Sequence, residues 1–432
     1  MKTTQINELT ELIRKDMRPA LGVTEPGAIA FAVSKARSLV EGKVSGVELT
    51  LNSGMYKNAY TCGIPNSRFM GNEYAAALGV IAGRPEKGLE CLADVREMDN
   101  AMAEMLVRTG RIQVHMGEVT SRIFIEAKVT AESGEAVVTI RDSHTNIVSI
   151  RVNGETVFEK TDEEKAETAQ AAVIHSYTLE EICEYAKTVP AEDISFIAQA
   201  YEMNYRLFEA GLESDRTTYG KYLLEKNGGE IISDDEQKTA SLLCNAAIEA
   251  RVIGLDYPAM SITGSGAHGI IATMPLYGVY CHRELPEETL WRATAISYLV
   301  CMYIKEYSGK LSAFCGCGIA AGTGMACGLV YLYGGGVAEM ERVIGNMASS
   351  ITGMICDGGN QGCTMKGIVA VDAAFQSVDF AMHGISVDPV HGINGKTPEE
   401  TMRHMGEIAS PGMTGTEKTI VDILQEKSAA GK

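Results

Sequence analysis

The hydrophobic pattern of this 432-residue chain changes its period once, and that change constrains the fold more than any other feature. Between residues 46 and 152, apolar residues alternate with polar ones, which is typical of half-buried strands. Two helical stretches interrupt the alternation, at 72–82 and 90–109. Beyond about residue 171 the pattern is helical almost to the end. The sequence therefore predicts an α+β protein with a small α/β domain and a large all-helical domain.

The same pattern predicts four parts along the chain. Residues 1–45 should form two helices that pack on the helical domain, with Thr24 as the N-cap of the second. Residues 46–153 should form the α/β domain. Residues 154–170 are acidic and poor in apolar side chains, which favours a linker. Residues 171–432 should form the helical domain.

Charge and composition exclude several classes of protein. Lys and Arg number 38 against 56 Asp and Glu, for a net charge of −18. Such a surface repels nucleic-acid phosphates and anionic lipid. No run of about 18 apolar residues is present, and the N-terminus lacks the apolar region of a signal peptide. We expect a cytoplasmic protein with no nucleic-acid or membrane partner, whose 11 cysteines are not disulfides.

Five cysteines crowd into a glycine-rich stretch, namely Cys315, Cys317, Cys327, Cys356 and Cys363. Apolar spacing predicts a helix over 343–355 with Gly358 and Gly359 as its C-terminal cap, so that Cys356 ends one helix and Cys363 opens the next. Cys315 should precede another helix. Thiols at helix ends beside glycines make a suitable metal pocket. Two alternatives stay open: cysteines that only pack, and a zinc site with Cys317 as fourth ligand.

Two polar groups are candidates for a substrate site. Residues 263–269 form a glycine-rich turn whose N–H groups and hydroxyl suit a small carboxylate, without the Lys-Ser/Thr of a nucleotide-binding loop. Lys57, Asn58 and His144 lie near strand ends of the α/β domain, where they could bind a carboxylate or act as a base. The alternative for 263–269 is a glycine-rich helix entry that only allows close packing, and for Lys57, Asn58 and His144 it is ordinary surface or turn residues. No Gly-x-Ser-x-Gly turn follows a strand, so a hydrolase gains no support.

These residues also carry a resemblance to a known family. The matching stretches are Ala20-Leu21-Gly22-Val23-Thr24-Glu25-Pro26, Lys57-Asn58, His144-Thr145-Asn146-Ile147-Val148, Ser265-Gly266 with Ala272-Thr273-Met274-Pro275, Leu311-Ser312-Ala313-Phe314-Cys315, and Gly353-Met354-Ile355-Cys356-Asp357-Gly358 through Cys363. Over nearly its whole length the chain resembles the UPF0597 family, the bacterial and archaeal L-cysteine desulfidases. That family is related to the iron–sulfur L-serine dehydratases, whose helical domain holds a [4Fe–4S] cluster by three cysteines.

The resemblance implies a [4Fe–4S]-dependent lyase with a small amino acid as its partner. β-Elimination of L-cysteine to pyruvate, ammonia and sulfide is the first expectation. The alternatives are a dehydratase of L-serine, L-threonine or a related hydroxy acid, and an iron–sulfur redox sensor. A homodimer is left open. The implied cluster ligands are Cys315, Cys356 and Cys363, with Cys317 in reserve. Candidate bases are His144, Lys57 and His268, and candidate substrate-binding residues are Thr24, Glu25, Asn58, Asn146, Ser265 and Gly266.

The sequence departs from the family's usual motif at one position. Where relatives carry Gly-Cys-Thr-Glu-Pro, this chain has Val23 in place of the cysteine. His268 also stands where many relatives carry an amide. A related substrate is therefore the main alternative to cysteine. The remaining cysteines are expected to be small buried or partly buried residues. Among them Cys62 is singled out because it lies in a loop of the α/β domain.

Overall fold

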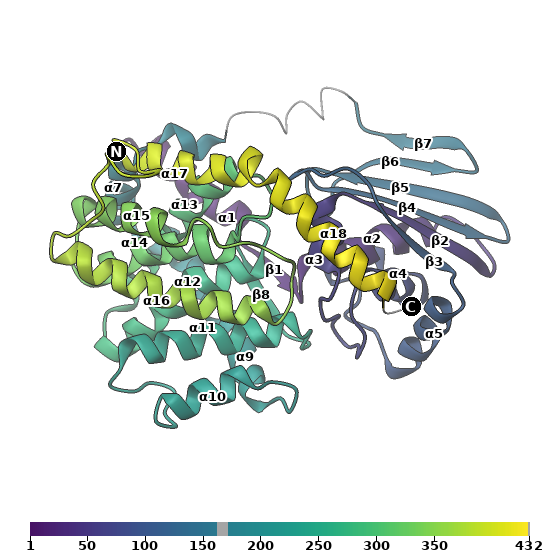
Figure 1. Ribbon diagram of the computed structural model, residues 1–432, viewed down its shortest axis with the longest axis horizontal. Coiled ribbons are helices and arrows are strands. Elements are labelled where there is room, and N and C mark those ends of the chain that lie inside the picture. The colour runs from purple at the N-terminus through teal and green to yellow at the C-terminus, as the bar shows by residue number, and fades with distance from the viewer. Residues whose placement is uncertain (162–171, 431–432) are drawn as a thin grey trace.

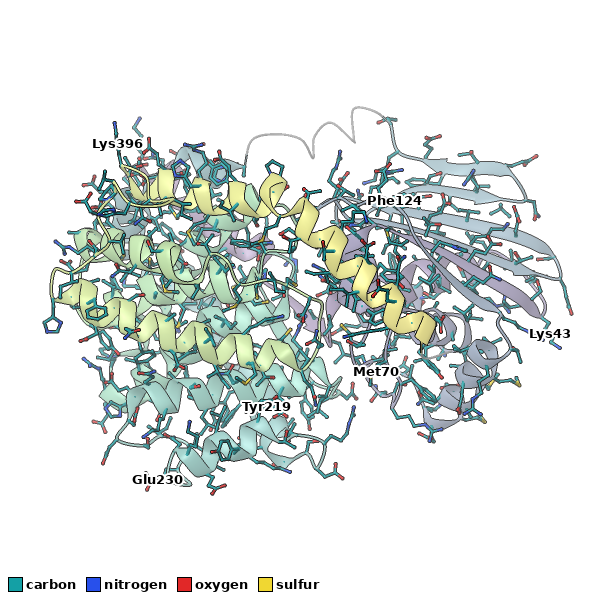
Figure 2. All side chains as sticks on the ribbon, in the orientation of Figure 1. Lys43, Met70, Phe124, Tyr219, Glu230 and Lys396 are labelled. Atoms are coloured by element: carbon teal, nitrogen blue, oxygen red, sulfur yellow. The ribbon has the colours of Figure 1, made fainter. Side chains whose placement is uncertain are left out.

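The computed structural model describes residues 1–161 and 172–430 and confirms the α+β architecture. Each of two domains has its own hydrophobic core, one beneath a mixed sheet and one within a stack of helices. Figure 1 shows the two side by side. Side chains fill both domains in Figure 2, where Lys43 marks the outer end of the α/β domain, and Glu230 and Lys396 lie at opposite sides of the helical domain.

The sheet has six strands in the order β3-β2-β4-β5-β6-β7. β2 pairs in parallel with β3, and every other neighbouring pair is antiparallel. Along β4 each second residue is buried, so one face of the sheet forms the core, as the alternation predicts. The strands are β2 (Val44–Leu51), β3 (Ile112–Met116), β4 (Phe124–Ala131), β5 (Gly134–Arg141), β6 (Ile147–Val152) and β7 (Glu155–Glu159).

Helices cover the buried face of the sheet. They are α2 (Thr24–Arg37), α3 (Ser53–Ala59), α4 (Asn72–Ile81) and α5 (Glu97–Arg108), with a 3-10 turn at Pro85–Glu90. The expectation that both N-terminal helices pack on the helical domain is wrong for α2, which contacts β4, β5 and α4. Twelve of its fourteen residues are buried, because small side chains let the sheet and its neighbours approach it closely. α1 (Thr3–Asp16) does lie on the helical domain, against α13.

The acidic segment expected as a linker is partly a strand. β7 extends the sheet by pairing antiparallel with β6, and all five of its residues are exposed. An exposed edge strand buries no face, so its acidic composition gave no strand signal. The remainder of the expected linker, 162–170, lies outside the described residues.

The helical domain contains one short two-stranded sheet. β1 (Arg18–Leu21) pairs antiparallel with β8 (Pro258–Ser261), which corrects the all-helical expectation. Strands of four residues are too short to show a period in the sequence. The helices are α7 (Leu179–Thr188), α8 (Ala191–Ile194), α9 (Ala198–Glu213), α10 (Tyr219–Lys226), α11 (Glu236–Val252), α12 (Gly266–Arg283), α13 (Glu287–Ser308), α14 (Gly322–Leu332), α15 (Val337–Ile351), α16 (Gly362–Met382) and α17 (Pro398–Glu407), with short helical turns at Val173–Ser176, Ser195–Ile197, Cys317–Ala321 and Ile408–Gly412.

The last helix leaves the helical domain and lies on the α/β domain. α18 (Thr414–Ala430) contacts α3, and Figure 1 shows it running from one domain to the other. The Tyr60 hydroxyl donates to the Leu424 carbonyl oxygen at 2.8 Å, and Val421 belongs to the core under the sheet. The expected helical domain therefore ends before α18.

Within 1–161 and 172–430, none of the helices is both long and apolar enough to cross a membrane.

Candidate active site

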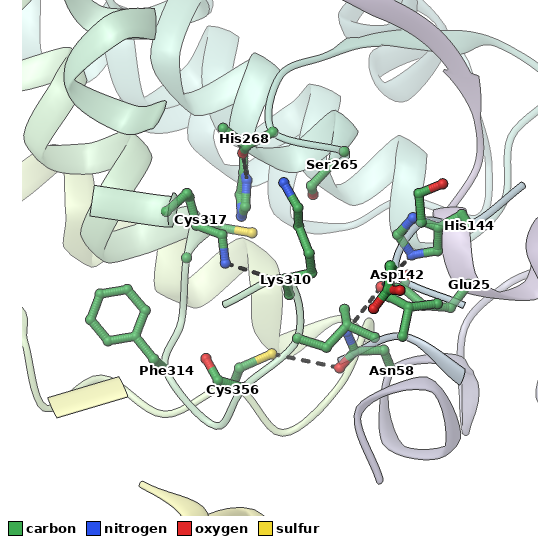
Figure 3. A pocket seen from close by; sticks show the side chains of 18 of the residues that line it. Glu25, Asn58, Asp142, His144, Ser265, His268, Lys310, Phe314, Cys317 and Cys356 are labelled. Atoms are coloured by element: carbon green, nitrogen blue, oxygen red, sulfur yellow. Dashed lines mark hydrogen bonds and ion pairs between the residues drawn. The ribbon is translucent and has the colours of Figure 1, made fainter. Parts of the chain in front are cut away.

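A cavity of about 220 Å³ lies at the boundary between the two domains. Side chains from both domains line it, and Figure 3 shows them turned toward one another. Seven sequence-predicted residues are among the lining residues: Glu25, Asn58, His144, Ser265, His268, Cys317 and Cys356. The site therefore combines a carboxylate, an amide, two imidazoles and two thiols in one small space.

Glu25 supplies an ionised carboxylate to this cavity from the first turn of α2. Asn58 Nδ2 donates to Glu25 Oε1 at 3.0 Å, and His144 Nε2 lies 3.8 Å from the same oxygen. Burial alone would raise the pKa of Glu25, but His144, Asn58 and Arg251 outweigh it and lower the pKa to about 2. Glu25 is therefore negatively charged at neutral pH.

His144 presents a nitrogen that the protein itself does not satisfy. Its Nε2 is buried and has no hydrogen-bond partner among the residues described. The imidazole lines the cavity, and its Nε2 is directed at Glu25 Oε1, at 3.8 Å and so beyond hydrogen-bond distance (Figure 3). His144 is therefore one of the polar side chains that a molecule bound in the cavity would contact.

His268 lies in the first turn of α12, on the opposite wall. Its Nδ1 shares a hydrogen bond of 2.5 Å with Thr263 Oγ1. Burial, followed by the charges of Lys305 and Arg251, holds the pKa of His268 well below its ordinary value. A Cβ on Gly316 would stand 2.7 Å from His268 Nε2, so only glycine lets the Cys315–Cys317 loop approach this ring. His268 is neutral at pH 7.

Lys57 is fully buried beside the cavity and does not line it. Its Nζ donates to the carbonyl oxygens of Ser312 at 3.1 Å and Cys356 at 2.8 Å, and to Glu417 Oε2 at 2.8 Å. Burial alone would lower the pKa of Lys57, but the charges of Cys356 and Glu417 raise it. The Lys57 ammonium therefore links α3 to α18 and to two loops that we call the first cysteine loop (309–317) and the second cysteine loop (352–363).

The two cysteine loops pair with each other as short extended segments. Cys315 N–H donates to the Met354 carbonyl oxygen at 3.0 Å, and Cys356 N–H donates to the Ala313 carbonyl oxygen at 2.6 Å. The prediction that Cys356 ends a helix is wrong, because α15 already ends at Ile351. The predictions that Cys363 opens a helix and that Cys315 precedes one are confirmed by α16 and by the turn Cys317–Ala321.

Gly358 and Gly359 allow close contact between domains and do not cap α15. A Cβ on Gly358 would lie 2.5 Å from the Lys57 carbonyl oxygen. A Cβ on Gly359 would lie 2.5 Å from Cys62 Sγ and 3.0 Å from Val23 Cγ1. Val23 and Cys62 therefore lie together beneath the second cysteine loop, and neither lines the cavity.

Three thiols converge at this junction. Cys315, Cys356 and Cys363 lie close enough that ionising one thiol raises the pKa of the others, whereas the Lys366 ammonium lowers the pKa of all three. Among described residues, no group of three or more His, Cys, Asp or Glu side chains could hold a metal ion. The zinc alternative with Cys317 as fourth ligand therefore gains no support.

The thiols differ in how readily they ionise. The Cys317 thiol, which donates to Cys315 Sγ, lowers the pKa of Cys315 to about 7 against the effect of burial, and the Gly318 N–H at 3.5 Å adds to this. Burial raises the pKa of Cys356, and it raises that of Cys363 to about 12. Among these three thiols, Cys315 therefore ionises most readily.

Three predicted substrate-binding residues do not line the cavity. Asn146 accepts from Lys160 Nζ at 2.6 Å and belongs to a turn of the sheet. Thr24 lies at the start of α2 with Val23 at the N-cap, so the predicted cap is wrong; its hydroxyl donates to the Gly264 carbonyl oxygen at 3.3 Å. Gly266 lies just behind the cavity wall.

Sequence reasoning missed several charged residues of the cavity. These are Asp16, Asp142, Lys305 and Lys310. Single charged residues in loops and at helix ends carry no periodic signal, so tertiary structure alone brings them here.

Residues 86–422 match the model of the serine dehydratase alpha chain family, and the chain belongs to that family. Its relatives include UPF0597 proteins, which confirms the resemblance seen in the sequence. One from Clostridium botulinum (strain Hall) is 40% identical over 98% of this chain and 99% of its own. Others are 35% identical in Caldanaerobacter subterraneus, over 97% of this chain and 98% of the relative, and 32% identical in Clostridioides difficile, over 96% and 99%.

Proposed function

We propose that this protein is a lyase that removes the β-substituent of a small amino acid, with L-cysteine as the first substrate and L-serine as the second. The family supports dehydratase-like chemistry. The observation that carries the proposal is the cavity, where ionised Glu25 and the imidazole of His144 lie across from Cys317 and Cys356. A proton acceptor on one side and thiols on the other suit an elimination reaction.

A [4Fe–4S] cluster held by Cys315, Cys356 and Cys363 is part of this proposal. A cluster distributes its thiolate ligands over separate iron atoms, so they need not surround one point as the ligands of a single ion must. The three mutually interacting thiols fit this requirement, and Lys366 offsets part of their negative charge. When bound, the cluster supplies a Lewis acid that favours departure of the β-substituent.

His144 is the best of the three candidate bases. Lys57 holds its proton and donates three hydrogen bonds, so it has no capacity to accept another proton. His268 faces the charges of Lys305 and Arg251, which oppose its protonation. Glu25 beside His144 instead stabilises the imidazolium that forms when His144 takes a proton.

The polar groups of the cavity can bind the ammonium group of an amino acid and take up its Cα proton. Glu25 and the Asn58 amide oxygen suit the substrate ammonium group. Asn58 also connects the two sides of the cavity, because its Oδ1 lies 3.8 Å from Cys356 Sγ (Figure 3). His144 would remove the Cα proton, the electron pair would form the Cα–Cβ double bond, and the β-sulfur or β-oxygen would leave with its electrons. The aminoacrylate released would then take up water to give pyruvate and ammonia.

L-Serine stays the alternative substrate because of Val23. This residue lies under the cysteine loop against Gly359, outside the cavity lining, so it affects the substrate through the position of that loop. We also propose a cytoplasmic location, because all eleven cysteines are free thiols, which is typical of proteins in a reducing compartment. The homodimer stays a prediction.

Iron and sulfide analysis tests the cluster. Anaerobically reconstituted wild type is compared with Cys315→Ala, Cys356→Ala and Cys363→Ala, and with Cys327→Ala as a buried control. We expect lower iron in the first three and full iron in the control. A full cluster in any of the three would remove that cysteine from the ligand set.

A further inference from the structure

Arg251 is a buried cation with no ion-pair partner among the residues that the structure describes. It lies in the last turn of α11 and is 4% exposed. Its Nε has no hydrogen-bond partner, and its guanidinium forms no ion pair within the described parts of the chain. The other buried cations differ, because Lys57 has three acceptors and Lys305 donates to two backbone oxygens. A buried charge without a partner is costly, so it is rarely kept without a function.

The position of Arg251 places this charge behind the wall of the cavity. A Cβ on Gly266 would stand 2.6 Å from Arg251 Nε and 3.2 Å from its Cδ. Gly266 begins α12, whose N-terminus has no side-chain cap, and the preceding Ser265 lines the cavity. A helix N-terminus carries a partial positive charge and free N–H groups. Two positive elements therefore meet at one end of the cavity.

Within residues 1–161 and 172–430, no carboxylate pairs with Arg251, and Asp16, another anion of the cavity, accepts from the Thr263 N–H. Glu25 lies within electrostatic reach of Arg251 but does not form an ion pair with it, and its own contacts are Asn58 and His144. Lys310, the other cation at this end in Figure 3, already pairs with Glu306 at 3.2 Å. An anionic group on a bound molecule would complete the arrangement.

We propose that Arg251 positions the carboxylate of the substrate against the N-terminus of α12, so that this site selects amino acids with a free α-carboxylate. Arg251 acts from behind Gly266 through its charge, while N–H groups of the first turn make the contact. The substrate then lies with its carboxylate toward α12 and its ammonium toward Glu25. This inference rests on the proposed function for the identity of the carboxylate.

Two variants separate charge from packing. Arg251→Met keeps much of the length and removes the charge, and Arg251→Lys keeps the charge. The probes, titrated into anaerobically reconstituted protein by calorimetry, are L-alanine, which has a carboxylate but no leaving group, and ethylamine, which lacks the carboxylate. We expect Arg251→Met to weaken L-alanine binding about 10-fold, because the Arg251 charge acts on the carboxylate without touching it, and to leave ethylamine binding unchanged. Arg251→Lys should recover most of the affinity.

Turnover and stability give further readouts. Arg251→Met should raise KM for the active substrate with little change in kcat, because the carboxylate is bound equally before and during the reaction. Without ligand, Arg251→Met should unfold at the same or a higher temperature than wild type, because an unpaired buried charge is removed. A lower unfolding temperature would show a structural role and overturn the inference, as would equal losses for both probes.

The two proposals fail in different ways. If neither L-cysteine nor L-serine is turned over, the proposed function fails while the L-alanine comparison still reports on Arg251. If turnover occurs and Arg251→Met leaves KM unchanged, only the role of Arg251 fails.

Discussion

Lys57 and Glu417 are 360 positions apart in the sequence and form a buried ion pair, with Nζ 2.8 Å from Oε2. The pair connects α3 to α18, and Lys57 also holds the Cys356 carbonyl oxygen. The Lys57 side chain therefore links α18 to the second cysteine loop. The integrity of the site should therefore depend on a helix that contributes nothing to the cavity.

Breaking this pair should destabilise the fold strongly. Glu417→Ala leaves the Lys57 charge buried and unpaired, which typically costs about 3–5 kcal/mol of unfolding free energy. Chemical denaturation measures the loss. The matched control is Lys418→Met on the same helix, which breaks an exposed pair with Asp422 and should change stability by less than about 1 kcal/mol. Equal effects of both variants would contradict the role given to Lys57.

Replacing His144 should remove proton transfer and leave the cysteine loops intact. His144→Asn is expected to lower kcat by about 10²- to 10⁴-fold, the usual contribution of a general base, with iron content unchanged. Exchange of the substrate Cα proton with deuterated solvent gives a direct readout. His115→Asn, at an exposed residue of β3, is the control and should match wild type. Normal proton exchange in His144→Asn would assign the base elsewhere.

Glu25 should make stability depend on pH in the acid range. Its pKa is about 2 in the fold against an ordinary 4.5, so its contribution is complete above pH 4.5 and is lost as pH falls toward 2. That shift corresponds to roughly 3 kcal/mol. Unfolding free energies of wild type and Glu25→Gln should differ at pH 7 and converge near pH 2. A difference that is constant over this range would show that the Glu25 charge is not the cause.

Gly359 should be required for the second cysteine loop to pack against Cys62 and Val23. Gly359→Ala places a Cβ 2.5 Å from Cys62 Sγ and 3.0 Å from Val23 Cγ1, so the loop must shift, at a typical cost of about 1–3 kcal/mol. Iron retained per chain after anaerobic reconstitution should fall. Gly353→Ala is the control in the same region, because a Cβ there has no atom within 4 Å. Equal iron in both variants would argue against this packing.

Regular elements were predictable because their burial imposes a period on the sequence. The alternation around Ile125 and Ala127 marks β4, whose second residues are all buried. By contrast, Gly358 and Gly359 follow an apolar run and so suggest a helix cap, although they serve contacts with Lys57 and Cys62 that are invisible in the local sequence.

Tertiary contacts also decided which candidate residues belong to the cavity. The sequence makes Lys57 a candidate base, but its ammonium donates to three acceptors. Asn146 is a candidate substrate ligand in the sequence, but its side chain donates to the Arg141 carbonyl oxygen within a turn. Arg251 carried no sequence signal because one arginine near a helix end is ordinary. Val23 is notable in the sequence because it replaces the family's cysteine. In the structure it packs beneath the second cysteine loop, against Gly359, and does not line the cavity.

Pyruvate release by anaerobically reconstituted wild-type protein tests the central claim most directly. Pyruvate is measured with L-cysteine and with L-serine, and sulfide is measured alongside. We predict pyruvate from L-cysteine with an equal amount of sulfide, and slower pyruvate from L-serine. Protein that carries its full iron complement and forms no pyruvate from either amino acid would contradict the account.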